Sequence, residues 1–351
     1  MIVVIADDLS GAAELAGAAR RYGLSAEVQT AFFPGTNADV VCVDTDSRLL
    51  PPADAAQRVA AVTRRIVAAQ PAWIFKKCDS VLRGPVLAEA RAAAEAAGQP
   101  RILLVPANPS RERTISAGTY LIAGQPLNET FFATDPTHPR LTADVKALLA
   151  GDLAQVAVPD IATAGDVRFQ AELIDAQTLP VGGVDFFSAL LLVRAVGKTL
   201  PGISAPAPGK TLLVCGSETA WPQRQSEARA RDIPAFSLPH DIPAATSALR
   251  AKDSVLIGIG NGPASRQVTP PELSRQLVQS VAVILRQAPV ERLLLEGGAT
   301  AAAVVAGLGW TRLRVEQVAD AGIGVLRPVA PQAPLLVVKP GSYPWPAAFW
   351  P

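Results

Sequence analysis

The sequence has 351 residues, of which 49% are hydrophobic and 18% are charged, and its formal net charge is +1. A chain of this length exceeds the usual size of a single hydrophobic core, so we expect two domains. The balanced charge offers no basic surface for nucleic acid. The apolar segments are interrupted before the ~20 residues that a membrane span needs, so we predict neither a nucleic-acid partner nor a membrane.

The three cysteines, Cys42, Cys78 and Cys215, are far apart and odd in number. This pattern argues against a disulfide framework and favours a reducing compartment. The two histidines, His138 and His240, are not clustered with cysteines, which excludes an ordinary structural zinc site. No signal-type segment precedes the first apolar run. We therefore predict a cytoplasmic protein.

The first half alternates short apolar runs with Ala-rich amphipathic segments. We expect strands in IVVIA, SAEVQT, ADVVCVDT, AWIFKK and RILLVPA, and helices over 10–22, 52–69 and 84–97. Such alternation is typical of a mainly parallel α/β sheet. Residues 106–140 are rich in Pro, Thr, Gly and Asn, and we expect them to form a long functional loop or a small subelement.

A second α/β pattern follows a Pro- and Gly-rich stretch at residues 200–210, which we predict to be a linker. Residues 141–200 continue the first pattern with weaker signals. Beyond the linker we expect strands in TLLVCGS, AFSLP, DSVLIGIG and RLLLEGG, and helices over 219–230, 271–286 and 299–308. The sequence therefore predicts an α/β protein with two domains, 1–203 and 210–351, each on a mainly parallel sheet.

Charged and polar side chains follow four predicted strands of the first half, at the edge of the sheet where α/β proteins bind ligands. They are Asp7, Asp8 and Ser10; Asp44, Asp46 and Arg48; Lys76, Lys77, Asp79, Ser80 and Arg83; and Asn108, Arg113 and Thr114. Arg and Lys bind carboxylates, and carboxylates accept hydroxyl protons, so a small polyhydroxylated anion suits this edge. Alternatively, Asp8 or Ser10 caps a helix, and Asp44 and Asp46 form turns.

Glycine-rich turns follow three predicted strands of the second half, in CGSETA, GIGNG and EGGAT. Small residues let backbone N–H groups approach a phosphate, and helix N-termini favour its charge. Near the C-terminus, Lys339 stands beside Gly341 and Ser342, where it can reach phosphates. Neither a Walker A sequence nor a dinucleotide fingerprint is present. Because such turns are common in α/β proteins, they are either phosphate-binding or purely structural.

Taken in chain order, IADDLSGA, VDTDSR, KKCDSVLRG, PANPSRERTISAGTYLIAGQPLNETFFATDP, CGSETA, EGGATAAAV and VVKPGSY resemble the four-carbon acid sugar kinase family. The resemblance covers most of the chain. It implies transfer of a phosphoryl group from ATP to the terminal hydroxyl of a four-carbon sugar acid such as threonate, erythronate or 3-oxo-tetronate. It also implies that the first domain binds the sugar acid, that the second binds the nucleotide, and that the active site is the interdomain cleft.

By position, the resemblance implies two sets of binding residues. The substrate set is Asp8, Arg48, Lys77, Asp79, Ser80 and Arg83, and the nucleotide set is Ser217, Gly258, Gly260, Gly297, Gly298, Thr300, Gly341 and Ser342. The chain departs from the family pattern at four positions, where Ala299 replaces an acidic residue, Pro344 interrupts a glycine-rich loop, Cys78 replaces Thr and Asn108 replaces Phe. The departures at Ala299 and Pro344 lie on the nucleotide side.

The adjacent Asp7 and Asp8 acquire a role in such a kinase. One carboxylate can orient or deprotonate the hydroxyl, and the other can help to hold the Mg²⁺ that ATP chemistry implies. We expect Asp8 to be the catalytic base, with Asp79 as the alternative, while Arg48, Lys77 and Arg83 clamp the carboxylate and the transferring phosphoryl group. We predict no metal ligands by residue.

Two rival functions stay open at this point. The chain is either a kinase or a degenerate family member that binds a sugar acid or a nucleotide without turnover, as Ala299 and Pro344 suggest. The third hypothesis is a sugar-phosphate phosphatase of the haloacid-dehalogenase type, because VDTDSR resembles the Asp-x-Asp motif that follows the first strand of those enzymes. An Ala-rich apolar surface permits a homodimer, and residues 200–210 are a candidate hinge for domain closure.

Overall fold

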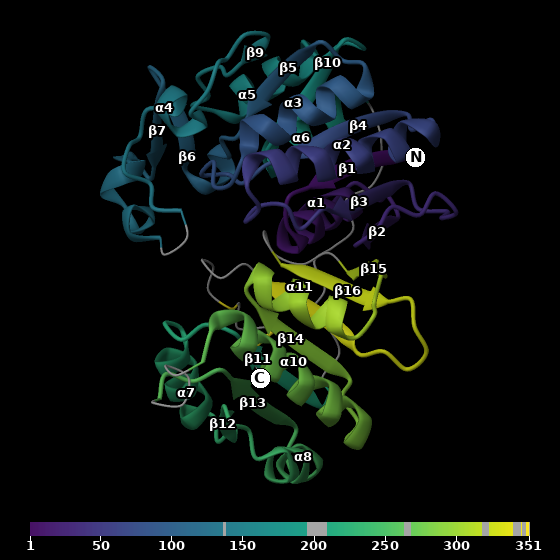
Figure 1. Cartoon of the computed structure of the whole chain (residues 1–351), viewed down its shortest axis with the longest axis vertical. Helices are drawn as coiled ribbons and strands as arrows, with labels where there is room; N and C mark the ends of the chain where they lie inside the picture. Colours follow the sequence, from purple (N-terminus) through teal and green to yellow (C-terminus); the bar gives the residue numbers. More distant parts are fainter. Residues whose placement is uncertain are drawn as a thin grey trace. The chain divides into compact units, whose positions relative to one another are not determined.

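The computed structural model describes residues 1–135, 138–194, 209–262, 268–317, 323–339, 345 and 349–350. The chain divides into two compact units, Met1–Pro201 and Gly202–Pro351. The first runs from purple to teal in Figure 1, and the second from green to yellow. Most of the predicted linker lies outside the described residues, and the expected cleft between the domains stays a prediction.

The first unit is built on a parallel sheet with the strand order β2-β3-β1-β4-β10-β5-β9. Its strands are β1 (Ile2–Ala6), β2 (Ala26–Gln29), β3 (Val40–Asp44), β4 (Trp73–Lys77), β5 (Arg101–Val105), β9 (Val156–Ala157) and β10 (Thr178–Gly182). Ile2 aligns with both Val40 and Trp73. Because these strands are parallel and in register, they end together at one edge of the sheet.

Helices cover both faces of this sheet, as Figure 1 shows. They are α1 (Leu9–Arg21), α2 (Pro52–Ala68), α3 (Val86–Ala97), α4 (Val145–Leu149), α5 (Ala164–Glu172) and α6 (Val184–Val193). Neighbouring residues of a strand point to opposite faces. On β4, Lys76 forms an ion pair with Glu89 of α3, whereas Lys77 faces Glu14 of α1. Helices α1 and α3 therefore lie on opposite faces.

Residues 106–140 form a small antiparallel subelement, which confirms the second of the two forms expected for them. It contains β6 (Arg113–Ser116), β7 (Thr119–Ile122), β8 (Gln125–Pro126) and the 3₁₀ turns η1 (Pro109–Arg111), η2 (Leu127–Glu129) and η3 (Phe131–Thr134). Ile115, Tyr120, Leu127 and Phe132 are buried beneath it. These four apolar side chains anchor a segment that its polar composition marks as a loop.

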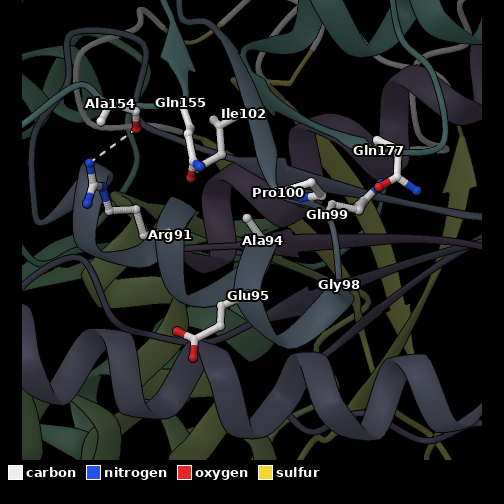
Figure 2. A pocket seen from close by; sticks show the side chains of 10 residues that line it. All are labelled: Arg91, Ala94, Glu95, Gly98, Gln99, Pro100, Ile102, Ala154, Gln155 and Gln177. Atoms are coloured by element: carbon white, nitrogen blue, oxygen red, sulfur yellow. Dashed lines mark hydrogen bonds between the residues drawn. The ribbon is translucent and has the colours of Figure 1, made fainter.

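A cavity of about 670 Å³ opens at the amino-terminal edge of this sheet. Figure 2 shows the side chains that line it, with Arg91 donating a hydrogen bond to the Ala154 carbonyl at 3.4 Å. Its lining includes Ile102 and Gln177, which stand at the starts of β5 and β10. Ligands of α/β sheets bind at the opposite, carboxyl edge, so this cavity is separate from the predicted site.

The second unit has a mainly parallel sheet with the order β12-β13-β11-β14-β17-β16-β15. Its strands are β11 (Thr211–Cys215), β12 (Ala235–Ser237), β13 (Ser254–Gly258), β14 (Arg292–Glu296), β15 (Arg312–Gln317), β16 (Gly324–Pro328) and β17 (Leu335–Lys339). Strands β15 and β16 pair antiparallel, and so do β16 and β17. The helices are α7 (Trp221–Ala230), α8 (Ile242–Ala251), α10 (Pro270–Gln287) and α11 (Gly298–Gly307).

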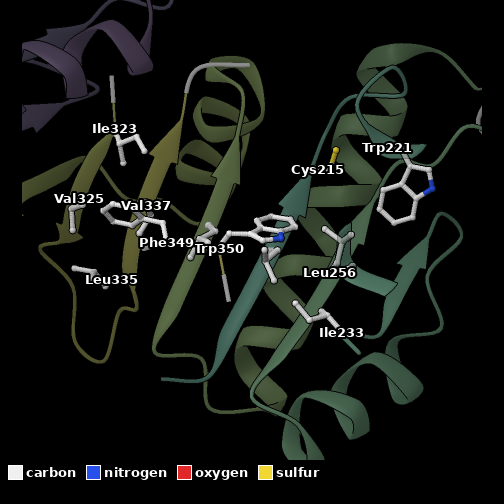
Figure 3. Close-up of a cluster of buried hydrophobic side chains, with 13 residues drawn as sticks. Cys215, Trp221, Ile233, Leu256, Ile323, Val325, Leu335, Val337, Phe349 and Trp350 are labelled. Carbon is white, nitrogen blue, oxygen red and sulfur yellow. The ribbon is translucent and has the colours of Figure 1, made fainter. Parts of the chain in front are cut away.

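A cluster of buried hydrophobic side chains covers one face of the second sheet, as Figure 3 shows. Its buried members include Leu213, Cys215, Trp221, Leu256, Leu294, Val337, Phe349 and Trp350. Trp221 belongs to α7, so this helix and the aromatic residues near the C-terminus share the same face. Burying a large apolar side chain stabilises a fold by roughly 1.5–3 kcal/mol, so these aromatic residues make up part of the core of this unit.

The structure confirms the predicted fold class, with both units built on α/β sheets. Each predicted strand and helix quoted above is present, with ends that differ by a few residues. The described part of the chain contains no helix with the length and apolar character needed to cross a bilayer.

Candidate functional site

Arg48 joins the charged strand ends of the first unit. Its Nε donates to Asp7 Oδ2 at 2.7 Å, and its two terminal nitrogens donate to the two oxygens of Asp8 at 2.8 Å each. Its Nη1 also lies 3.8 Å from Asp79 Oδ1. One guanidinium from the end of β3 therefore binds carboxylates that follow β1 and β4.

Both side-chain oxygens of Asp8 accept hydrogen bonds from other groups of the protein. Besides Arg48, its oxygens accept hydrogen bonds from the Gly11 backbone N–H at 2.8 Å and from Ser10 Oγ at 2.5 Å. Asp8 is the N-cap of α1, which is the structural role expected as an alternative. A Cβ at position 11 would stand 2.7 Å from Asp8 Oδ1, so glycine is required there.

Asp7 has an oxygen with no partner. Its Oδ2 accepts from Arg48, but its Oδ1 is buried and has no hydrogen-bond partner among the described residues. Burial alone would raise the pKa of this carboxyl, yet Arg48, Lys76 and Lys77 together hold its pKa below the ordinary value. Asp7 is therefore an ionised, 3% exposed carboxylate with a vacant acceptor position. Buried polar groups normally have partners, so such an orphan oxygen indicates a ligand.

Asp79 organises the turn that follows β4. Its Oδ2 accepts from the backbone N–H groups of Val81 and Arg83, and Arg83 adds two side-chain hydrogen bonds. Burial opposes the charge of Asp79, but Arg83 and Arg48 hold its pKa far below the ordinary range. Leu82, in the same turn, is buried with φ of 60°, a left-handed conformation that costs energy for a branched side chain.

Lys77 lies between the acidic groups of α1 and β1. Its Nζ donates to the Cys78 carbonyl at 2.5 Å and stands 3.7 Å from Glu14 Oε2. The other oxygen of Glu14 is 2.7 Å from Arg111 Nη1. Glu14 and Arg111 are not among the residues predicted from the sequence. The sequence pattern that could have indicated Glu14 is its position one helical turn beyond Gly11, on the face of α1 that meets β4.

The small subelement contributes two further groups to this edge. Arg113 Nη1 donates to Ser80 Oγ, and Arg83 Nη1 donates to Asp135 Oδ2 at 3.1 Å. The guanidinium carbons of Arg83 and Arg113 lie 5.7 and 5.6 Å from the centre of the Phe132 ring. Ser80 and Arg83 thus lie beside other predicted substrate residues, while Phe132 and Asp135 stand in the last part of the fourth family motif, FFATDP, and were given no individual role.

Asp44 behaves differently from its acidic neighbours. It is 5% exposed, and its Oδ1 accepts the backbone N–H of Asp46 at 2.8 Å, as a turn former does. Burial, reinforced by Asp8, Asp46 and Asp7, raises the pKa of Asp44 well above its ordinary value. Asp44 thus acts as a turn former in this structure, which is the structural alternative expected for it.

A second ion cluster lies at the strand ends of the second unit. Glu296, at the end of β14, accepts from Arg224 at 2.8 and 3.0 Å and is 3.1 Å from Lys339 Nζ. Trp350 covers Arg224 and Trp345 covers Lys339, each with its ring centre 5.6 Å from the cation. Lys339 is completely buried. In this structure its ammonium is therefore bound by Glu296 and is not exposed to solvent.

The glycine turns predicted to bind a nucleotide have tight backbone environments. Gly260 and Gly297 have φ of 76° and 94°, which favours glycine, and a Cβ at Gly258 would meet the ring of Trp221. Helix α11 begins at Gly298 with no side-chain cap, so its first N–H groups suit an anion. Thr300 lies in the first turn of this helix, while Ser217 Oγ accepts the Ala220 N–H at 3.2 Å. Gly341 and Ser342 lie outside the described residues.

No group of three or more His, Cys, Asp or Glu side chains within the described ranges could hold a metal ion. Magnesium in phosphoryl transfer is usually bound by one or two carboxylates together with substrate phosphates and water. The vacant oxygen of Asp7 fits such a minimal donor set. It fits a substrate hydroxyl equally well.

Comparison with known proteins places these observations in a family. A profile described as a sugar-binding N-terminal domain matches residues 2–183. A D-threonate kinase from Bordetella bronchiseptica is 32% identical over 65% of this chain, and the match spans only 62% of that relative. A D-threonate kinase from Cupriavidus necator is 29% identical over 99% of this chain and 96% of its own length. A solved Haemophilus influenzae protein of family DUF1537 has a similar fold, with a TM-score of 0.73, 20% identity and coverage of 99% of this chain and 98% of its own.

Proposed function

The chain belongs to the four-carbon acid sugar kinase family, and from that premise we propose that it transfers a phosphoryl group from ATP to the terminal hydroxyl of a four-carbon sugar acid. The relatives named above act on D-threonate, which supports this substrate class. The observation that carries the proposal is the vacant, buried oxygen of ionised Asp7 at a sheet edge lined with Arg and Lys.

Asp7 is the residue we propose as the catalytic base. Its free Oδ1 can accept the hydroxyl proton, whereas both oxygens of Asp8 already accept hydrogen bonds from Arg48 and from the start of α1. This proposal replaces the sequence-based preference for Asp8. Asp8 then acts through Arg48, because the shared guanidinium fixes both carboxylates. Asp79, with four hydrogen bonds from its own turn and Arg83, is a positioning residue.

Cations at this edge complete the proposed sugar-acid site. Arg48 follows β3, while Lys77 and Arg83 come from the end of β4 and the turn after it; Arg48 and Lys77 supply positive charge to Asp7, and Arg83 binds Asp79. A carboxylate and a transferring phosphoryl group are both anionic, and charge-assisted hydrogen bonds to them are strong. Ser80, held by Arg113, offers a hydroxyl that can bind a substrate hydroxyl. The mixed charge matches an anion that also carries hydroxyl groups.

The second unit is proposed to bind the nucleotide. Bound ATP supplies the phosphoryl group, and its Mg²⁺ neutralises charge on the phosphates. On the protein side, the uncapped N-terminus of α11 and the turns at Gly258, Gly260 and Gly297 would hold phosphates through backbone N–H groups. Lys339 is assigned no phosphate contact, because Glu296 binds it and Trp345 covers it.

A coupled ADP-release assay tests this function. The purified chain is given Mg-ATP with D-threonate, D-erythronate, 3-oxo-tetronate or, as the control, the uncharged alcohol threitol. We expect ADP release with at least one acid and none with threitol, because the cationic edge requires an anion. Absence of release with every acid, together with no ATP binding by calorimetry, would favour the degenerate reading suggested by Ala299 and Pro344.

A further inference from the structure

Glu14 lies at the junction of two cations from different strand ends. It stands in α1 with its side chain 12% exposed, its Oε1 2.7 Å from Arg111 Nη1 and its Oε2 3.7 Å from Lys77 Nζ. The first distance is a charge-assisted hydrogen bond, and the second is too long for one. Arg111 therefore holds Glu14 by a close ion pair, while Glu14 acts on Lys77 through its charge and without a hydrogen bond.

Arg111 is a fixed anchor because its turn is pinned to α6. Ser110, the preceding residue, donates its backbone N–H and its hydroxyl to the carboxylate of Asp185 at 2.9 and 2.6 Å. Asn108 accepts the Asp185 backbone N–H through its Oδ1 at 3.0 Å. These bonds hold η1 against the start of α6, so the guanidinium that binds Glu14 is itself held in place.

The side chain of Lys77 runs across α1 to reach Glu14. A Cβ placed on Gly11 would lie 3.5 and 3.6 Å from Lys77 Cγ and Cε, so the lysine stem packs directly on that glycine. Its ammonium has three donors, of which one binds the Cys78 carbonyl. Asp7 and Lys77 attract each other, yet their side chains form no ion pair with each other. Within the described residues their attraction therefore acts through charge and not through a direct ion pair.

The adjacent lysine forms a shorter and more deeply buried pair. Lys76 Nζ lies 2.6 Å from Glu89 Oε2, and the two side chains are 1% and 2% exposed. That pair lies on the other face of β4, under α3, although the charge of Lys76 also acts on Asp7. Lys77 and Glu14 are farther apart and more exposed, and Lys77 likewise acts on Asp7 through its charge.

We infer that Glu14, anchored by Arg111, positions the ammonium of Lys77 so that the substrate hydroxyl binds between Lys77 and Asp7 Oδ1. This inference rests on the proposed function. In it, Lys77 donates a hydrogen bond to the reacting hydroxyl oxygen while Asp7 accepts its proton. Lys77 then stabilises the negative charge that develops on this oxygen as its proton moves to Asp7. Glu14 touches neither substrate nor nucleotide and is a positioning residue.

The test compares Glu14→Gln with the control Glu172→Gln, which breaks the exposed ion pair with Arg168 on α5. We expect E14Q to lower kcat by about tenfold or more, in the range of a misplaced catalytic group, while the Kd of the sugar acid without ATP changes less than about threefold. E172Q is expected to leave the thermal midpoint nearly unchanged and kcat within about twofold of wild type, because exposed ion pairs contribute little.

The pH profile provides a readout that a loss of packing would not move. The groups that face Lys77 are Glu14 from α1, Asp7 after β1, Arg48 after β3 and Cys78 beside it. Burial lowers the pKa of Lys77, but Glu14 and Asp7 raise it above its ordinary value. In E14Q the loss of kcat at alkaline pH should therefore begin at lower pH than in wild type, and E14D should restore part of the difference.

Several outcomes would overturn this inference. They are an E14Q enzyme with unchanged kcat and alkaline limb, a Kd that rises while kcat stays constant, and an equal loss of kcat in E172Q. If E14Q does not fold, Arg111→Lys weakens the same anchor with charge retained and should lower kcat in the same direction. A wild-type chain without turnover on any acid would defeat the proposed function instead, which keeps the two failures distinct.

Discussion

The two units each place an ion cluster at the carboxyl ends of their parallel strands, but the clusters differ in how completely they are satisfied. In the second unit, Glu296 binds Arg224 and Lys339, and tryptophan rings cover both cations. In the first unit, Arg48 is 16% exposed and Asp7 keeps one oxygen without a partner. Among the described residues, the first cluster keeps a carboxylate oxygen without a hydrogen-bond partner, whereas both oxygens of Glu296 accept from Arg224.

This difference separates a binding site from a structural ion cluster of similar composition. Buried ions are expensive unless they are paired, and both oxygens of Glu296 are bound, by Arg224 and Lys339. Asp7 is bound by Arg48 through one oxygen, and its other oxygen has no hydrogen-bond partner among the described residues. Beside the Glu296 cluster the unpartnered atoms are the indole Nε1 groups of Trp345 and Trp350, so it is the unpartnered carboxylate oxygen that distinguishes the two clusters.

The largest effect is expected for Asp7→Asn. The amide keeps an oxygen that can accept from Arg48, so the fold should be retained, but it cannot take a proton. We expect kcat to fall by about 10²- to 10⁴-fold, the usual contribution of a general base. Steady-state kinetics checks the rate, and circular dichroism checks the fold.

The matched control for this change is Asp46→Asn, at an exposed strand-end carboxylate in a left-handed conformation that asparagine tolerates. It should keep kcat within about twofold. A D7N enzyme with near-normal kcat would transfer the role of base to another carboxylate and remove the functional difference between the two clusters.

Glu296→Gln should act on stability. It removes the buried carboxylate that Arg224 and Lys339 share, and breaking a buried pair in this way costs about 3–5 kcal/mol of unfolding free energy. Urea unfolding followed by tryptophan fluorescence measures it, since Trp345 and Trp350 lie against the cluster. Glu227→Gln removes the 30% exposed partner of Arg224 and should cost less than about 1 kcal/mol. Equal losses of unfolding free energy in E296Q and E227Q would contradict a buried ion cluster centred on Glu296.

Asp44→Asn should have a smaller effect that depends on pH. The pKa of Asp44 is raised in the folded state, so above about pH 4 the unfolded chain releases a proton that the folded chain retains. Folding stability falls with rising pH, by about 1.4 kcal/mol per pH unit, until pH passes the folded pKa. D44N removes this loss and should melt higher than wild type at pH 7 and equally at pH 4. A difference that is constant with pH would show that Asp44 is ionised in the fold.

The regular elements were predictable because their apolar periodicity is local. IVVIA and TLLVC are buried along their whole length, as parallel strands are. The antiparallel pair β15 and β16 went unassigned, since its residues carry Arg and Glu at alternate positions and lie outside the strand-helix alternation. The role of Phe349 and Trp350 as core residues was also missed, because their burial depends on long-range packing.

The candidate site was predictable in position and only partly in role. Strand-end motifs located Asp7, Asp8, Arg48, Lys77 and Asp79 at one edge. Which carboxylate is satisfied depends on hydrogen bonds between segments about 40 residues apart, such as those of Arg48, and sequence does not contain that geometry. Lys339 is a further case, since a lysine before a glycine turn predicts phosphate binding, and its ion pair with Glu296 at the end of a neighbouring strand is not visible in the sequence.

Hydrogen-exchange mass spectrometry with and without the accepted sugar acid, in the absence of nucleotide, tests the central claim most directly. The acid should slow exchange in the peptides that carry Asp7 to Glu14 and Lys77 to Arg83, where the unsatisfied cluster lies. Peptides around Arg224, Glu296 and Lys339 should not change. Protection confined to the second set would contradict the assignment of the sugar-acid site to the first unit.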